Sequence, residues 1–314
     1  MHTAPHRASW IDIVLTALAP AIWGSTYIVT TALLPPDRPF TAAALRCLPA
    51  GMLLSCYLRR LPQRSAWGRL AVLAALNIGC FQALLFVAAY RLPGGVAAVV
   101  GAIQPLLVMG LAWALERRQP GKLAMGAAVL GVFGMAALLL SPGSAWDAPG
   151  IAAALTGAAC MASGTYLARR WRPEVPVLAF TGWQLLAGGL MLTPLAWAFD
   201  PPLPPLSGTQ LLGYAYLSLI GALAAYALWF RGISRLSPVA LSSLGLLSPL
   251  TAVLLGWVLL GQSLTVWSLA GLLTVLGSIL ALQWASSNAG ATPSARSPAP
   301  PGIESRAPGS SGLL

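Results

Sequence analysis

Arg46 carries the strongest chemical signal in the sequence, because it lies inside a long apolar stretch, residues 40–58. It is about six residues from the start of that stretch, which is roughly 9 Å along a helix. A guanidinium at that depth is costly unless it reaches the surface by snorkelling, faces a wet cavity, or binds carbonyls or an anion. The sequence leaves three roles open: lining a cavity, anchoring a broken helix, and snorkelling.

Uncharged polar and aromatic side chains occur at similar depth in other apolar stretches. In residues 11–32, Pro20 and Gly24 loosen the helix, so that backbone carbonyls can turn toward a cavity. Hydroxyls and an indole N–H could bind a polar solute there, while the aromatic rings bury its apolar part. Small residues would equally permit close helix packing. The candidates in this stretch are Trp23, Ser25, Thr26 and Tyr27.

The remaining candidates are amides, hydroxyls and aromatic side chains in five other stretches. Uncharged amides in a bilayer usually face the protein interior, so cavity lining and interhelical hydrogen bonding are both open. These residues are Asn77, Gln82, Gln104, Thr165, Tyr166, Gln184, Tyr226 and Trp229.

The groups that catalysis or metal binding would need are missing from the apolar stretches. Both histidines, His2 and His6, precede the first stretch, and the acidic residue closest to a stretch interior, Asp12, lies at an edge. The single lysine, Lys122, lies in a loop, and no Gly-x-x-x-x-Gly-Lys-Ser/Thr motif is present. We therefore predict no catalytic residues, no metal site and no cofactor, and the absence of central carboxylates leaves the coupling of any proton flow open.

The elements that must position these residues are membrane helices. The chain of 314 residues is 57% hydrophobic and 8% charged, whereas soluble proteins are about 25% charged. Apolar stretches of about twenty residues, enough to cross a bilayer core, recur throughout. We predict an all-α integral membrane protein with ten transmembrane helices, at residues 11–32, 40–58, 67–90, 95–115, 122–141, 150–168, 176–198, 209–230, 238–260 and 264–285.

The basic residues orient these helices. The net charge of +11 is spread in short clusters between apolar stretches, which is typical of membrane orientation and not of nucleic-acid binding. With the N-terminus inside, fifteen Lys and Arg lie on the inner side and two, Arg38 and Arg91, on the outer side. This bias predicts that both termini are cytoplasmic.

The sequence contains an internal duplication. Residues Ala83–Leu115 recur 144 residues later as Ala227–Leu259, with eleven of thirty-three positions identical, including Arg91/Arg235 and Trp113/Trp257. Residues Trp23–Tyr27 resemble Ala162–Tyr166 more weakly, and Arg46 aligns with Gln184. Five spans per half is an odd number, so the second half must be inverted in the membrane, as in many secondary transporters with a central site. The repeated prolines, Pro105 and Pro249, are predicted to kink their spans and to act in gating.

The chain resembles the EamA-type family of the drug/metabolite transporter superfamily. The matching segments are Ala19–Val29, Ala43–Gly51, Ala83–Leu115 and Leu115–Leu139. The resemblance implies ten helices in two inverted five-helix repeats, and export or exchange of small metabolites, often amino acids. It also places an arginine at the position of Arg46, and we expect that residue to contact a substrate carboxylate or to order the outer gate.

These observations together predict a secondary transporter, with a small-molecule substrate, in a bacterial cytoplasmic (inner) membrane. A channel, a non-transporting scaffold and an intramembrane enzyme are the alternatives. The predicted organisation is an N-terminal segment at 1–10, a first repeat at 11–141, a second repeat at 150–285, and a disordered cytoplasmic tail at 286–314 that is rich in Ser, Pro and Gly. Neither the substrate nor the oligomeric state follows from the sequence.

Overall fold

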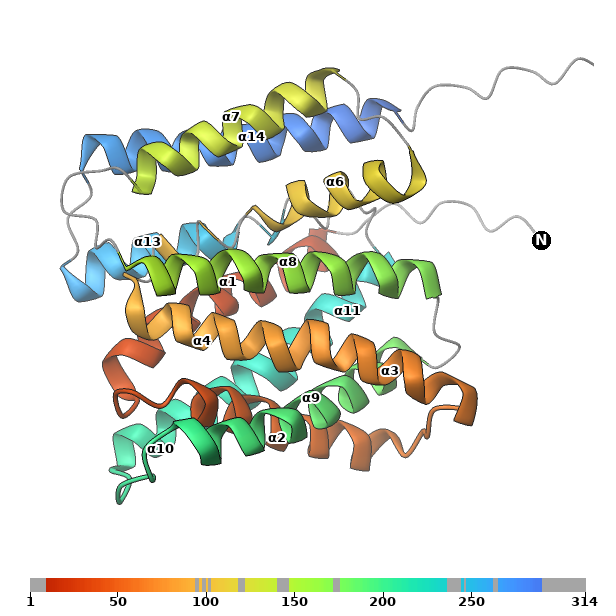
Figure 1. The fold of residues 1–314 in the computed structure, drawn as a ribbon, viewed down its shortest axis with the longest axis vertical. Coiled ribbons are helices and arrows are strands. Elements are labelled where there is room, and N and C mark those ends of the chain that lie inside the picture. Colours follow the sequence, from red (N-terminus) through yellow and green to blue (C-terminus); the bar gives the residue numbers. More distant parts are fainter. Residues whose placement is uncertain are drawn as a thin grey trace, which may run out of the picture.

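The protein is a stack of long, roughly parallel or antiparallel helices (Figure 1). The computed structural model describes residues 10–93, 96–97, 100, 103–117, 122–139, 147–171, 176–235, 244–245, 247–261 and 265–289. All regular structure among these residues is helical. The first ten residues, apart from Trp10, and the predicted tail from residue 290 onward lie outside the described part of the chain.

The first repeat contributes α1 (Trp10–Leu33), α2 (Pro39–Leu58), a short 3₁₀ helix η1 (Arg64–Ala66), and a long third helix. That third helix is continuous through α3 (Trp67–Ala74), a π-helical segment η2 (Ala75–Cys80) and α4 (Phe81–Arg91). Helices α6 (Gln104–Glu116) and α7 (Lys122–Leu139) follow.

The second repeat has the same order of elements. It contains α8 (Ala148–Trp171), α9 (Val177–Phe199), and a long third helix made of α10 (Gly208–Ala215), η3 (Tyr216–Ala224) and α11 (Ala225–Arg235). Helices α13 (Leu247–Leu260) and α14 (Val266–Ala289) end the described chain. The 144-residue shift between the repeats places η2 on the second part of η3, so the π-helical segment itself is duplicated.

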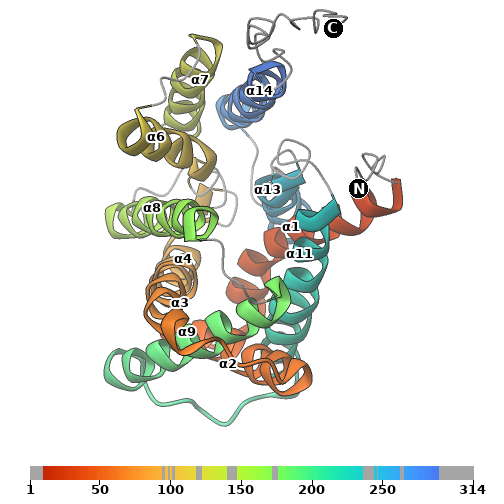
Figure 2. The same cartoon turned by 90° about the vertical axis from the view of Figure 1, so that its right-hand side faces the viewer.

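Packing between the repeats is reciprocal. The first helix of each repeat packs against the third and fourth helices of the other, so α1 contacts α11 and α13 while α8 contacts α4 and α6. The two second helices, α2 and α9, pack together at one end of the stack, and the two fifth helices, α7 and α14, pack together at the other (Figure 2). The main helix contacts of one half therefore have equivalents in the other half.

The two repeats run in opposite directions. Helix α1 begins near Asp12 and ends beside Pro35, whose carbonyl accepts a hydrogen bond from Tyr90 at 2.9 Å. The next residue, Arg91, pairs with Asp147, directly before α8 begins, so α8 starts where α1 ends. The helices therefore begin and end on two sides of the molecule, which we call the Asp12 face and the Asp147 face after the acidic residue on each. This arrangement is the inversion that the odd number of predicted spans requires.

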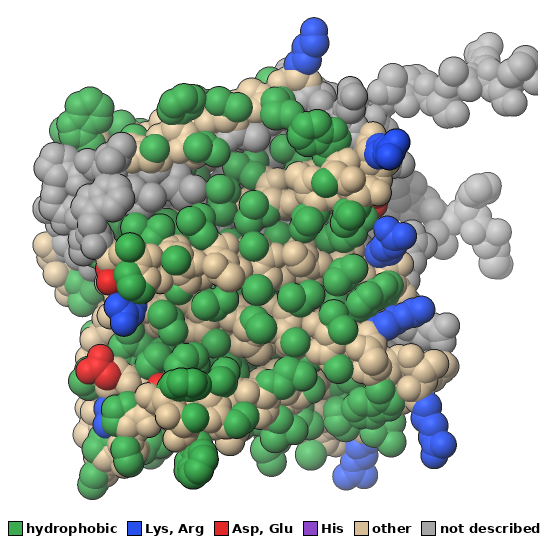
Figure 3. Space-filling view, in the orientation of Figure 1, with side chains coloured by type: hydrophobic (Ala, Val, Ile, Leu, Met, Phe, Trp, Pro, Cys, Tyr) green, Lys and Arg blue, Asp and Glu red, His purple; other side chains and the backbone are tan. Residues whose placement is uncertain are grey.

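Six described helices are long and apolar enough to cross a membrane: Ile11–Leu33, Pro39–Leu58, Arg64–Arg91, Ala148–Ala168, Leu178–Phe199 and Gly208–Trp229. Large apolar side chains such as Trp197 and Val266 project outward, as expected of a lipid-facing surface. Figure 3 shows Lys and Arg gathered along the edge where α3 begins and α8 ends, with an apolar band beside it. The protein is therefore a multi-pass membrane protein, while the count of ten spans and the cytoplasmic location of the termini stay predictions.

Two details differ from the predicted boundaries. Helix α14 continues to Ala289, four residues into the predicted tail, because no Gly or Pro interrupts residues 285–289. The prolines do not lie mid-helix: Pro105 is the second residue of α6 and Pro249 the third residue of α13. Proline fits the first turn of a helix, because a backbone N–H there would have no intrahelical partner and proline lacks that N–H. That these prolines kink the spans 95–115 and 238–260 and act in gating stays a prediction.

Candidate functional site

Arg46 lies where the two repeats meet. It is on α2 and is only 2% exposed. Its Nη1 donates to Thr26 Oγ1 on α1 at 3.2 Å, and its Nη2 donates to the Gly221 carbonyl in η3 at 3.1 Å. The guanidinium carbon lies 5.9 Å from the centre of the Phe86 ring on α4. Snorkelling is excluded by this burial, and the side chain joins three helices of the first repeat to one of the second.

The π-helical turn of η3 leaves the Gly221 carbonyl without its usual partner in the helix, so that it can accept hydrogen bonds from side chains. In an α-helix the amide of Ala225 would donate to Gly221, but here it donates to the carbonyls of Ile220 and Ala222. A π-helical turn shifts the backbone pairing by one residue and is frequent at functional sites. The Gly221 carbonyl accepts a second bond from Trp23 Nε1 at 3.1 Å. Two side chains from the first repeat therefore converge on one carbonyl of the second.

Aromatic rings cover one side of this arrangement. The Trp23 ring lies 5.3 Å from the ring of Tyr226 and 5.2 Å from that of Trp229, both tilted. Such tilted pairs contribute roughly 0.5–1.5 kcal/mol beyond their burial. The rings form an apolar wall next to the polar contacts. We call the whole set the Arg46 centre: Trp23, Thr26, Arg46, Gln82, Phe86, Gly221, Tyr226 and Trp229.

Gln82 is completely buried within the Arg46 centre. It lies one helical turn before Phe86 on α4 and beside the Tyr226 phenol. Neither its amide oxygen nor its amide nitrogen makes a hydrogen bond of regular geometry, and the Nε of Arg46 also has no partner. Unsatisfied buried polar atoms of this kind are rare and call for an explanation.

A second polar contact occupies the equivalent position in the other half. Gln184 on α9 is 8% exposed and accepts a bond from Asn77 Nδ2 in η2 at 3.0 Å. A Cβ at Gly164 on α8 would collide with the Asn77 amide. Gln184 aligns with Arg46, and the 144-residue shift relates Asn77 to Gly221. We call Asn77, Gly164 and Gln184 the Gln184 centre; it has the geometry of the Arg46 centre without its charge.

The other predicted residues lie elsewhere. Tyr27 packs in the apolar cluster around Ala88 and Val253. Tyr166 is not brought to either centre, since its hydroxyl donates to Glu116 Oε1 at 3.2 Å near the end of α6. Thr165 is partly buried on α8, without a side-chain hydrogen bond to another described residue. The side chains of Gln104, Pro105 and Pro249 lie outside the described part of the structure.

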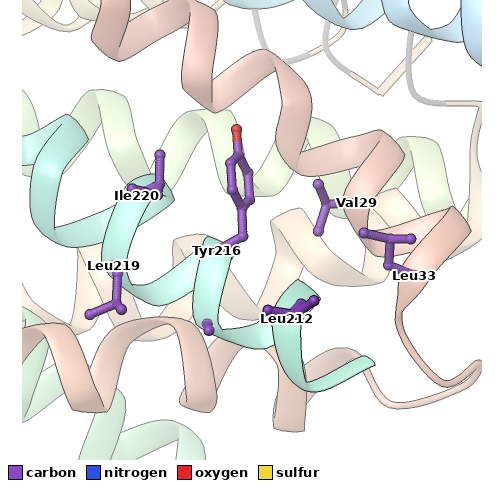
Figure 4. A pocket seen from close by; sticks show the side chains of 7 residues that line it. Val29, Leu33, Leu212, Tyr216, Leu219 and Ile220 are labelled. Carbon is purple, nitrogen blue, oxygen red and sulfur yellow. The ribbon is translucent and has the colours of Figure 1, made fainter. Parts of the chain in front are cut away.

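Ser25, the neighbour of Thr26 in α1, contacts a residue that lines a groove. Its hydroxyl lies 2.7 Å from the hydroxyl of Tyr216, the first residue of η3. Figure 4 shows Tyr216 beside Ile220 with its hydroxyl pointing away from Leu212. The groove has a volume of about 470 Å³, and its lining is Val29, Leu33, Leu212, Ala215, Tyr216, Leu219 and Ile220. Its apolar lining on membrane-capable helices suits contact with lipid.

One ion-pair cluster lies at each face of the protein. On the Asp12 face, Asp12 contacts Arg231 at 2.6 Å and Arg235 at 3.1 Å. On the Asp147 face, Asp147 contacts Arg91 at 3.3 Å. Arg91 and Arg235 are the repeated arginines, and each pairs with the acid at the start of the other repeat's first helix. Sequence reasoning found the arginines but missed their partners, because the pairing is made only between repeats.

The described residues contain no group of three His, Cys, Asp or Glu that could hold a metal ion. The profile of the EamA-like transporter family matches residues 10–140 and 148–283. The chain belongs to this family. The two matched segments agree with the duplication read from the sequence, and the family is one of transporters and not of enzymes.

Three relatives show how far the similarity extends. Protein PecM of Dickeya dadantii is 44% identical over 267 residues, covering 84% of this chain and 90% of that protein. A WAT1-related chloroplastic protein of Arabidopsis thaliana is 30% identical over 284 residues, covering 85% of this chain and 68% of its own. The uncharacterized transporter YwfM of Bacillus subtilis is 30% identical over 274 residues, covering 84% and 91%.

A solved crystal structure matches with a TM-score of 0.64 at 18% identity, covering 89% of this chain and 98% of that one. At that identity the match shows the fold alone.

Proposed function

We propose that this EamA-family member is a secondary transporter that moves small amphipathic metabolites, amino acids or related solutes, outward across the cytoplasmic membrane by alternating access. The observation that carries the proposal is Arg46, which is held by Gly221 of the opposite repeat. Transporters built from inverted repeats bind their substrate at the contact between the repeats. The charged side chain of Arg46 lies at that contact. The polar contacts would hold the solute's charged or polar groups, and the Trp23 ring and its neighbours its apolar part.

The arrangement suits rocking of one repeat against the other. The Arg46 centre joins α2 to η3, and the Gln184 centre joins α9 to η2, so both lie at contacts between repeats. An ion pair lies at each face, Asp12 with Arg235 and Asp147 with Arg91. Opening toward one face would break the ion pair there and keep the other. Pro105 and Pro249, at the starts of α6 and α13, are proposed to permit the movement of those helices.

The proposal contains no proton relay through a carboxylate. The described acidic residues lie at helix ends or in loops, and Arg46 forms no ion pair with any of them. A gradient of the solute itself, or exchange for a second solute, is therefore the driving force that we propose.

Counterflow in proteoliposomes tests the proposal. Vesicles containing the purified chain are loaded with an unlabelled amino acid and diluted into a trace of the labelled one, across a panel of amino acids and amphipathic carboxylates. We expect a transient, saturable accumulation of label for at least one solute, which empty vesicles do not show. A channel would give uptake without overshoot or saturation, a scaffold would give none, and either result would reject alternating access.

A further inference from the structure

The Arg46 centre contains a positive charge that no described residue balances. The three groups that contact the guanidinium are the Thr26 hydroxyl, the Gly221 carbonyl and the Phe86 ring, all of them neutral. A buried charge without a counter-charge is among the costliest features in a protein interior. The counter-charge is therefore expected from a bound molecule.

Four of the five described acidic residues are committed to other contacts, and the fifth, Asp37, lies in the turn between α1 and α2. Asp12 and Asp147 pair with arginines at opposite faces. The Asp200 carboxylate accepts a bond from the Thr41 amide, and Glu116 accepts one from Tyr166. None of them reaches the Arg46 centre without unfolding a helix end.

Unused hydrogen-bonding groups lie next to this charge. The Nε of Arg46 is buried without a hydrogen-bond partner, and the buried Gln82 amide, beside the Tyr226 phenol, makes no hydrogen bond of regular geometry. The Nε–H of the guanidinium and the N–H donors of the Gln82 amide beside it match a carboxylate, which accepts several short, charge-assisted bonds. By contrast, the oxygen free to accept from a cation is that of Gln82, since the Gly221 carbonyl already accepts two bonds. One amide oxygen is a weak match for an ammonium group.

We propose, on the basis of the transport function above, that the ligand of the Arg46 centre is an organic monoanion. Its carboxylate binds Arg46 and Gln82, and its apolar body packs on Trp23, Tyr226 and Trp229. A zwitterion binds less tightly than the monoanion, because its ammonium finds no carboxylate in the centre. An organic cation with the same apolar body is excluded by repulsion from Arg46. This ranking by charge is a property of the site that the family membership does not supply.

Four matched probes test the ranking by calorimetric titration of the purified full chain in detergent. They are 3-phenylpropionate, phenylalanine, 2-phenylethylamine and the neutral 3-phenylpropanamide, which share one ring and differ in charge. We expect 3-phenylpropionate to bind at least about tenfold more tightly than phenylalanine, and 2-phenylethylamine not to bind. Equal affinities, tighter binding of the zwitterion or cation, or no binding of 3-phenylpropionate would overturn the proposal.

Variants show whether Arg46 causes the ranking. Arg46→Gln is expected to weaken 3-phenylpropionate at least about tenfold and to leave 3-phenylpropanamide unchanged, which also shows that the variant is folded. Arg64→Gln, at an exposed position in η1, removes a charge of the same sign and is expected to change neither affinity. Loss of both ligands in Arg46→Gln would mean a structural role and would refute the assignment. Because this is a binding measurement, the chain can fail in counterflow and still show the ranking, or the reverse.

Discussion

The Arg46 centre and the Gln184 centre are two versions of one design. Each joins the second helix of one repeat to the π-helical turn of the other repeat's third helix. In the Gln184 centre an amide donates to an amide, at 3.0 Å, and the contact is neutral. In the Arg46 centre a guanidinium donates to a carbonyl, at 3.1 Å, and no described acidic residue pairs with its charge.

The difference indicates which of the two centres binds a ligand and which one only packs helices together. A neutral interhelical hydrogen bond is enough to hold two helices together in a membrane. An arginine in the same position adds desolvation cost without improving that contact. We therefore assign packing to the Gln184 centre and ligand binding to the Arg46 centre, and the predictions below compare changes in the two repeats.

The largest difference is expected between Arg46→Ala and Gln184→Ala. Loss of Arg46 should lower counterflow at least about a hundredfold, about 2.7 kcal/mol, because the transition state loses a charged contact. Loss of Gln184 should lower it by less than about threefold, since a neutral hydrogen bond contributes about 0.6 kcal/mol. The measurement is the initial counterflow rate per protein in the membrane. An Arg46→Ala variant of normal abundance and normal rate would contradict the assignment.

The next effect concerns a glycine in the first helix of each repeat: Gly24 packs α1 against α13, and Gly164 packs α8 against Asn77 of the Gln184 centre. A Cβ at Gly24 would meet the Ser248 carbonyl and Thr251 Cβ, which cannot move away, whereas at Gly164 it would meet the Asn77 amide, which can rotate. Gly24→Ala should therefore lower the free energy of unfolding by about 1–3 kcal/mol, and Gly164→Ala by less. Thermal unfolding in detergent measures both. Gly68→Ala is the control, since no atom lies within 4 Å of its Cβ position, and an equal loss in Gly164→Ala would contradict the comparison.

A smaller difference is expected between the two faces. Asp12 contacts two arginines and its side chain is 13% exposed, whereas Asp147 contacts one and is 27% exposed. Asp12→Asn should lower the free energy of unfolding by about 1 kcal/mol, and Asp147→Asn by a few tenths. Thermal unfolding at low salt measures the difference. It should shrink in about 1 M salt, which screens exposed charges; a difference that salt does not change would point to packing and not to charge.

The smallest effect is the hydrogen bond of the Gln184 centre itself. A double-mutant cycle with Asn77→Ala and Gln184→Ala should give a coupling energy of about 0.6 kcal/mol, as for other interhelical hydrogen bonds in membranes. The free energies come from unfolding of the two single variants, the double variant and the wild-type chain. A coupling above about 2 kcal/mol would mean that this centre carries more than packing.

The sequence alone determined the class of the protein, its duplication and its inversion. The hydrophobicity and the charge of a segment are properties of its own residues. Apolar stretches and basic loops can therefore be recognised without coordinates. Arg46 could be selected for the same reason, because a charge in an apolar stretch is unusual wherever the chain folds. The family match confirmed the resemblance, and the family profile matches the chain twice, at residues 10–140 and 148–283.

Only the tertiary structure decided which polar residues meet. Gly221 carries no side-chain signal, and it became an acceptor for Arg46 and Trp23 through a π-helical turn of the opposite repeat. Tyr166 occupies the position in the second repeat that corresponds to Tyr27 in the first, and yet its hydroxyl contacts Glu116 near a helix end. Contacts between repeats depend on helix rotation and depth, which are set by the packing of many side chains together. For this reason the sequence could identify the charged residue, and the fold had to show that no acidic residue in the described part of the chain pairs with it.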